Sequence, residues 1–174
     1  KLVEVATREG TEVVVISATF GLNGLPLPEG RPWAVNLIDT DRIIRQATAA
    51  RSAGADIVLV ALHWGDEYVE QPSAFQVEVA RTLAKPGQID LIYGHHAHVV
   101  QPIEQVHGVW VLFGLGNILS NLPTSDWWPA SAQDGVVVTV ALHVGADGSV
   151  TVDRPVAHPT WVDKEAGWVV RMVD

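Results

Sequence analysis

Three short apolar runs, separated by amphipathic segments, dominate the first 95 residues. Residues 11–20, 57–62 and 89–93 are rich in β-branched side chains and too short for isolated helices, so each is predicted to be a buried strand. Helical spacing of apolar residues marks two intervening helices, the first capped by Asp39 or Thr40 and closed by Gly54, the second opened by Pro72 and ended by Pro86. Residues 21–32 read as a loop and residues 33–38 as an extended segment. This β-α-β-α-β order predicts a parallel sheet with right-handed crossovers.

After residue 100 the pattern changes to alternation. Residues 108–113 and 167–173 are predicted strands, and residues 135–144 and 149–153 are predicted to form an antiparallel hairpin around a turn at 145–148. Trp127 and Trp128 lie in a loop, either as a core plug or as a ligand platform. The predicted fold class is therefore α/β: a mostly parallel sheet flanked by helices, with a β-rich antiparallel C-terminal part.

Composition narrows the class of protein. The 174 residues are 48% hydrophobic and 18% charged, which fits a single globular domain. The net charge of −9, with no Lys/Arg cluster, argues against a nucleic-acid partner. The absence of cysteine excludes thiolate zinc sites and cysteine nucleophiles. No signal peptide is evident, and no apolar run approaches the roughly 20 residues that span a bilayer.

Four of the seven histidines follow predicted strands. His95, His96 and His98 come after the third strand, and His63 comes after the second. Loops at the carboxyl ends of parallel strands form the ligand crevice of such sheets, and imidazole is the commonest metal-binding side chain. His96 and His98 point the same way if their segment is extended, whereas His63 is equally well explained as a histidine hydrogen-bonded within its loop. The pattern predicts a metal centre.

Several neighbouring residues are candidates for supporting roles. Glu67 either orients an imidazole or is a solvated loop charge, while Tyr68 and Gln101 are candidates for lining a pocket. Asn117 either binds metal through its amide oxygen or occupies a left-handed turn. Asp66 is read as a solvated loop charge. The isolated histidines, which are read as structural or surface residues, are His107, His143 and His158.

Three segments together resemble one family. They are residues 60–68 (VALHWGDEY), 94–104 (GHHAHVVQPIE) and 114–117 (GLGN), and they are similar to the poly-gamma-glutamate capsule-biosynthesis (CapA) family of the calcineurin-like metallophosphoesterase fold. The family usually has proline where Ala97 stands. The family also carries Gly-Asp and Asn-His motifs in an earlier half of the domain, and neither motif precedes His63 in this sequence. The resemblance thus implies that residues 1–174 form a single domain that is the C-terminal portion of a larger CapA-type domain, half of an α/β sandwich.

The resemblance also implies a site and a function. His63 and His96 are the expected catalytic residues, and the expected metal ligands are His63, His95, His96 and His98. Either His95 or His96 pairs with His98, and spacing favours His96. Glu67, Tyr68, Gln101 and Asn117 are expected to support the ligands or contact substrate.

The expected cofactor is a divalent metal, manganese, iron or zinc, with up to two ions in the complete domain. The implied function is a metal-dependent hydrolase acting in capsular or cell-envelope polymer biosynthesis. The expected partners are an anionic polymer or phosphoester substrate and other capsule-synthesis proteins, in an extracytoplasmic or membrane-associated location. The alternative is a non-catalytic polymer-handling module whose histidine site is structural or vestigial.

Overall fold

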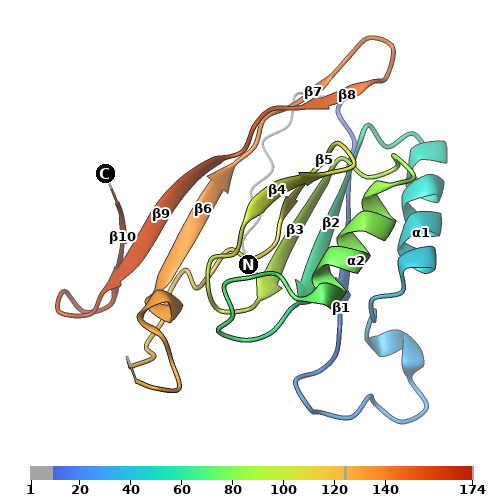
Figure 1. Ribbon diagram of the computed structural model, residues 1–174. Coiled ribbons are helices and arrows are strands. Elements are labelled where there is room, and N and C mark those ends of the chain that lie inside the picture. The colour runs from blue at the N-terminus through green and yellow to red at the C-terminus, as the bar shows by residue number, and fades with distance from the viewer. Residues whose placement is uncertain (1–9, 124, 174) are drawn as a thin grey trace.

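The computed structural model describes residues 10–123 and 125–173. Two helices cover one face of a five-stranded sheet, and a long antiparallel extension leaves its far edge (Figure 1). The elements are β1 (Val13–Thr19), η1 (Pro32–Ala34), α1 (Thr40–Ser52), β2 (Ile57–Trp64), α2 (Ala74–Ala84), β3 (Leu91–His96), β4 (Ile103–Val106), β5 (Val109–Leu112), η2 (Ala130–Gln133), β6 (Asp134–Thr139), β7 (Leu142–Val144), β8 (Val150–Val152), β9 (Val156–Asp163) and β10 (Val169–Met172).

The main sheet has the strand order β1-β2-β3-β5-β4. Neighbouring strands are parallel except β4, which runs antiparallel to β5. This mostly parallel sheet, with helices on it and antiparallel strands after it, confirms the predicted fold class.

The strands β2 and β3 run further than predicted. Their pairing continues through His63 opposite His95 and Trp64 opposite His96. The prediction that these histidines lie in loops was therefore wrong, because the backbone ladder holds them as the last residues of the strands. Three imidazoles are thus positioned by a rigid sheet.

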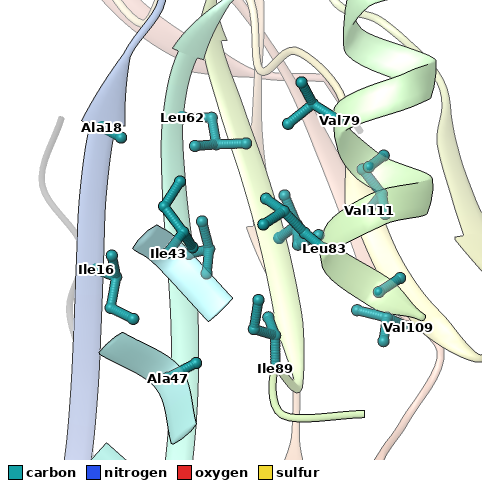
Figure 2. Close-up of a cluster of buried hydrophobic side chains, with 14 of the residues drawn as sticks. Ile16, Ala18, Ile43, Ala47, Leu62, Val79, Leu83, Ile89, Val109 and Val111 are labelled. Atoms are coloured by element: carbon teal, nitrogen blue, oxygen red, sulfur yellow. The ribbon is translucent and has the colours of Figure 1, made fainter. Parts of the chain in front are cut away.

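The core lies between the sheet and its two helices (Figure 2). Val58, Val60 and Leu62 alternate along β2 and pack against Ile43 of α1 and Leu83 of α2, all of them fully buried. Burying a side chain of this size contributes about 1.5–3 kcal/mol. The opposite face carries a smaller cluster formed by Ile57, Leu59, Ala61, Leu91, Tyr93 and Leu112.

Both helices begin at side-chain caps. The Asp39 carboxylate accepts a hydrogen bond from the backbone N–H of Arg42 at 2.9 Å, as one of the two predicted caps. The second helix begins at Ala74, not at Pro72. Ser73 caps it in a capping box: the Ser73 hydroxyl accepts from the backbone N–H of Gln76, and the Gln76 side chain accepts from the backbone N–H of Ser73. Two N–H groups at the helix start are thereby satisfied, which a proline at the first helical position would not do.

The C-terminal strands form two further sheets. The predicted turn at residues 145–148 is present between β7 and β8, but β6 pairs with β9, a strand that was not predicted. Pro155 and Pro159 flank and interrupt that segment, and proline argues against a strand assignment. Residues 33–38 were also predicted as extended, whereas the structure has a 3-10 turn at Pro32–Ala34 and a single bridge from Leu37 to Thr19.

Neither described helix reaches the length that a bilayer crossing requires: across residues 10–123 and 125–173 no candidate membrane-spanning helix is found.

Candidate metal centre

The register of β2 and β3 brings three imidazole rings together. His63 lies directly opposite His95, and their ring centroids are 5.2 Å apart. The His96 ring lies closer still, 4.3 Å from that of His63. The structure therefore places these three predicted site residues at one edge of the sheet. His63 and His95 also line a hollow of about 270 Å³ together with Asn36.

Among the residues that the structure describes, Glu67, His96 and His98 form a close group of potential ligand atoms. A carboxylate oxygen of Glu67 lies 3.8 Å from His96 Nδ1 and 4.0 Å from His98 Nε2, and all three atoms lie within 4.8 Å of one another. First-row metals bind imidazole and carboxylate at about 2.0–2.2 Å, so two ligands of one tetrahedral ion are about 3.4 Å apart. A small inward movement of these side chains would close the group around one ion.

The His96 nitrogen that faces Glu67 is buried and unsatisfied. Its side chain is only 6% exposed, and Nδ1 has no hydrogen-bond partner within the described part of the chain. A buried polar atom left without a partner costs about 1–3 kcal/mol. A bound cation would remove that cost, so the donor set fits a divalent metal.

Burial also favours the metal-binding form of this imidazole. Desolvation lowers the pKa of His96, and the opposing charge of Glu67 offsets part of that decrease. The ring is thus held neutral near pH 7, the state in which a histidine nitrogen offers a lone pair.

Asn117 fixes the ring of His98. The Asn117 side-chain N–H groups donate to the carbonyls of His98 and Ala132, at 3.1 and 2.8 Å. Its Oδ1 is therefore the acceptor that lies 2.9 Å from His98 Nδ1. The proton of neutral His98 is then on Nδ1, which leaves the lone pair on Nε2, the atom nearest Glu67. Asn117 thus uses its side-chain amide to fix the orientation and the tautomer of the His98 ring.

Three residues of the site have strained backbones. Tyr68, His96 and His98 adopt φ values of +65°, +104° and +60°, a backbone region that residues other than glycine rarely occupy. The predicted extended geometry from His96 to His98 was therefore wrong, and their nitrogens converge through the turn instead. Such strain costs about 1–3 kcal/mol per residue and concentrates at functional sites.

Tyr68 holds the turn in place from the β2–α2 loop. Its backbone N–H donates to the carbonyl of Ala97 at 2.7 Å, and its ring stacks on His98 with a centroid separation of 5.6 Å. The loop that carries Glu67 is thereby tied to the turn that carries His98.

A buried pair of amides supports the same loop. Gln76 and Gln101 are 0% and 2% exposed, and Gln76 Nε2 donates to Gln101 Oε1 at 2.8 Å. Gln101 in turn donates to the carbonyl of Val69 at 2.8 Å. Its amide is thus occupied by protein groups, so Gln101 supports the loop of Glu67 instead of facing a ligand.

Close packing beneath the site requires glycine at residue 94. A Cβ there would lie 2.1 Å from the carbonyl oxygen of Phe113 and 2.2 Å from Nε1 of Trp64. Those two groups are hydrogen-bonded to each other at 3.0 Å. Gly94 therefore lets β3 approach β5 directly before the histidines.

Two residues near the histidines were not predicted from the sequence. The Thr19 hydroxyl lies 2.9 Å from His63 Nδ1, and the Phe20 ring lies 4.8 Å from that of His96. Both come from the end of β1, which is remote in sequence. Only the expectation that parallel strands end at one edge could have pointed to them.

The remaining candidates lie outside this group. Asp66 is exposed, as its reading as a solvated charge predicted, and Trp127 is 82% exposed. His143 pairs with Asp153 across the β7–β8 hairpin, and His158 lies 3.3 Å from the Thr139 hydroxyl. His107 lies in the turn between β4 and β5.

Comparison with solved structures shows the fold. The NAD nucleotidase NadN of Haemophilus influenzae superimposes with a TM-score of 0.50 at 16% identity, covering 98% of this chain and 34% of that one. The chain therefore shares its fold with part of that nucleotidase.

Sequence comparison identifies the relatives. The chain is 45% identical over 65 residues to the PGA biosynthesis protein CapA of Bacillus subtilis (strain 168), covering 37% of this chain and 17% of the relative. It is 33% identical over 119 residues to the capsule biosynthesis protein CapA of Bacillus anthracis, covering 67% of this chain and 27% of the relative. The matched segments span only 17% and 27% of the lengths of these two relatives. The family model described as "Bacterial capsule synthesis protein PGA_cap" matches residues 3–122, more than half of the chain, so this protein belongs to the PGA_cap family.

Proposed function

We propose that this chain carries the histidine-rich part of a divalent-metal centre in a hydrolase of capsular or cell-envelope polymer synthesis. The observation that carries the proposal is the convergence of Glu67 Oε1, His96 Nδ1 and His98 Nε2, of which the His96 nitrogen is buried and has no hydrogen-bond partner among residues 10–123 and 125–173. Nitrogen and carboxylate donors together suit zinc, iron or manganese. A divalent ion held there would supply Lewis-acid activation of water and of the bond to be cleaved.

The residues of the chain have distinct roles in this proposal. Glu67, His96 and His98 hold the ion with His63 as a further ligand, and His95 lies beside them to bind a second ion or a reacting group. Paired ions in hydrolases lie about 3.5–4 Å apart and need ligands from several strands. We propose that further segments of the full-length protein supply the ligands of the second ion.

The acidic charge of the chain limits the substrates. With 20 acidic and 11 basic residues, a metal-free surface would repel a phosphoester or an anionic polymer. Bound cations would therefore be needed for either to approach. We propose an anionic polymer or phosphoester as substrate, other capsule-synthesis proteins as partners, and the cell envelope as the location.

Metal titration of the chain tests the centre. Calorimetry with zinc or manganese should give one ion per chain for the wild type, and at least tenfold weaker binding for Glu67→Gln and for His98→Ala. His143→Ala is the matched control, because His143 lies in an exposed hairpin away from the site, and it should bind as the wild type does. Equal binding by all four proteins would contradict the proposed ligands.

Turnover by the full-length protein separates an enzyme from a binding module. With manganese, hydrolysis of bis-nitrophenyl phosphate should be abolished by His63→Ala and by His98→Ala. Metal-dependent retention of polyglutamate without turnover would favour the non-catalytic polymer-handling module. A full-length protein that neither binds nor cleaves such substrates with any divalent metal would reject both functions.

A further inference from the structure

His63 is held by a hydroxyl on the neighbouring strand. Thr19 ends β1 directly opposite His63 in the parallel pairing of β1 with β2, so both side chains lie on the same face. Thr19 Oγ1 is 2.9 Å from His63 Nδ1. This contact joins the edge strand to the candidate metal centre.

The proton positions in this contact follow from the other partners of Thr19. Its hydroxyl lies 2.6 Å from the carbonyl of Gly21, which can only accept, so the hydroxyl proton is used there. The backbone N–H of Gly21 donates to the same oxygen at 3.3 Å. A hydroxyl has one proton and two lone pairs, so only a lone pair remains for His63. His63 Nδ1 must therefore be the donor.

A neutral imidazole with its proton on Nδ1 carries its lone pair on Nε2. The same result holds for His98, whose Nδ1 donates to Asn117. His63 of β2 and His98 in the turn after β3 are thus held in one tautomer by two different oxygen acceptors. The nitrogen that a metal or a proton would reach is Nε2 in both rings.

We propose that Thr19 is a positioning residue of this site, which holds His63 in the tautomer whose Nε2 binds the metal. The proposal rests on the proposed metal function. Without an acceptor at Nδ1, the ring can rotate and can place its proton on Nε2, where no cation can bind. Partners that orient a metal-binding histidine in this way are typically worth 10- to 100-fold in metal affinity.

Substitutions at Thr19 test the proposal. Thr19→Val keeps the branched shape that suits a strand and removes the hydroxyl, whereas Thr19→Ser keeps the hydroxyl. Thr139→Val is the matched control, because Thr139 also lies near a histidine, His158, but outside the site. Nitrogen-15 NMR of the imidazole rings of the metal-free protein reads the tautomer directly.

In the wild type, Thr19→Ser and Thr139→Val, the proton of His63 should be on Nδ1. In Thr19→Val the population should shift toward the Nε2 proton, and zinc affinity should fall at least tenfold, while Thr19→Ser retains it. A wild-type His63 with an unprotonated Nδ1 would overturn the proposal. So would a Thr19→Val variant that shows the shifted tautomer but binds zinc as tightly as the wild type.

The NMR readout separates this proposal from the proposed function. If no variant binds metal while the Nδ1 proton is present and moves in Thr19→Val, the metal function fails, and with it the role of Thr19 in that function. If metal binds and depends on Glu67 and His98 but the His63 tautomer differs from the prediction, only the role of Thr19 fails.

Discussion

The helix-covered face of the main sheet and the edge where its strands end differ in side-chain polarity and in backbone strain. On the face, Leu62 and its neighbours are fully buried, apolar and regular in backbone (Figure 2). At the edge, which begins with the next residue, His63, imidazoles gather and three residues have strained backbones. A buried nitrogen of His96 also has no hydrogen-bond partner in the part of the chain that the structure describes. Packing on the face stabilises the fold, whereas the polar groups held close together at the edge destabilise it.

This contrast teaches where a function is to be sought. Strain and unsatisfied polar atoms persist only where the surrounding structure over-determines them. Here the surrounding structure consists of the β2–β3 ladder, the buried Gln76–Gln101 pair and the Asn117 amide. Breaking the face should therefore cost stability, whereas breaking the edge should cost metal binding.

The largest expected effect is that of Leu62→Ala. Removing a fully buried leucine side chain costs about 2–5 kcal/mol, so the urea midpoint should fall sharply. His63→Ala, one residue further along β2, should cost about 1 kcal/mol in unfolding free energy while weakening zinc binding. Urea titrations and calorimetry on the two variants measure both quantities. Equal loss of stability in the two would remove the contrast between face and edge.

A smaller effect is expected from the backbone of His96. Because its φ is +104°, His96→Gly should be more stable than His96→Ala by about 1–2 kcal/mol, the reverse of the usual order. Both variants lose the same ring, so the difference between them reports strain alone, and both should bind zinc weakly. Thermal melts of the two proteins measure the difference. If the alanine variant is the more stable, the site stores no strain at this residue.

The smallest effect concerns the pH dependence of a carboxyl beside the site. Partial burial raises the pKa of Asp134, whose backbone carbonyl accepts from Asn117. Between the unfolded value, about 3.9, and the raised value, the folded protein holds more protons than the unfolded chain, so stability falls as pH rises through that window.

Asp134→Asn should therefore be slightly more stable than the wild type at pH 7. The gain in unfolding free energy should be less than about 1 kcal/mol, because solvent screens the carboxyl. The difference should become small at about pH 3, where the Asp134 carboxyl is mostly protonated in both the folded and the unfolded chain. Melting curves at pH 3 to 7 measure it. A difference that persists at pH 3 would show that charge is not its cause.

Much of the architecture was predictable because its patterns are local. The apolar runs before His63 and His95, and the helical spacing between them, were sufficient for the order of strands and helices. The meeting of the histidines at one edge then followed from parallel topology. The strand β9 was missed because Pro159 within it and Pro155 just before it argue against a strand in any local window.

The details of the site were not local. Thr19 reaches His63 across 44 residues, and Gln76 reaches Gln101 across 25, so no spacing rule connects them. Glu67 was predicted as an orienting group, but its approach to both His96 and His98 depends on the turn at residues 96–98. The left-handed φ values that create this turn belong to histidines, which give no such signal in a sequence.

The register of β2 against β3 also constrains how this family can change in length. Side chains alternate along a strand, so deleting one residue between Ile57 and Leu62 would turn every later side chain to the opposite face. His63 would then enter the helix-covered core, and Trp64 would take its place among the imidazoles. Insertions in the exposed loop of residues 21–31 carry no such penalty, because no ladder transmits them. Variation in length should therefore accumulate after β1 and be absent from the strand that delivers His63.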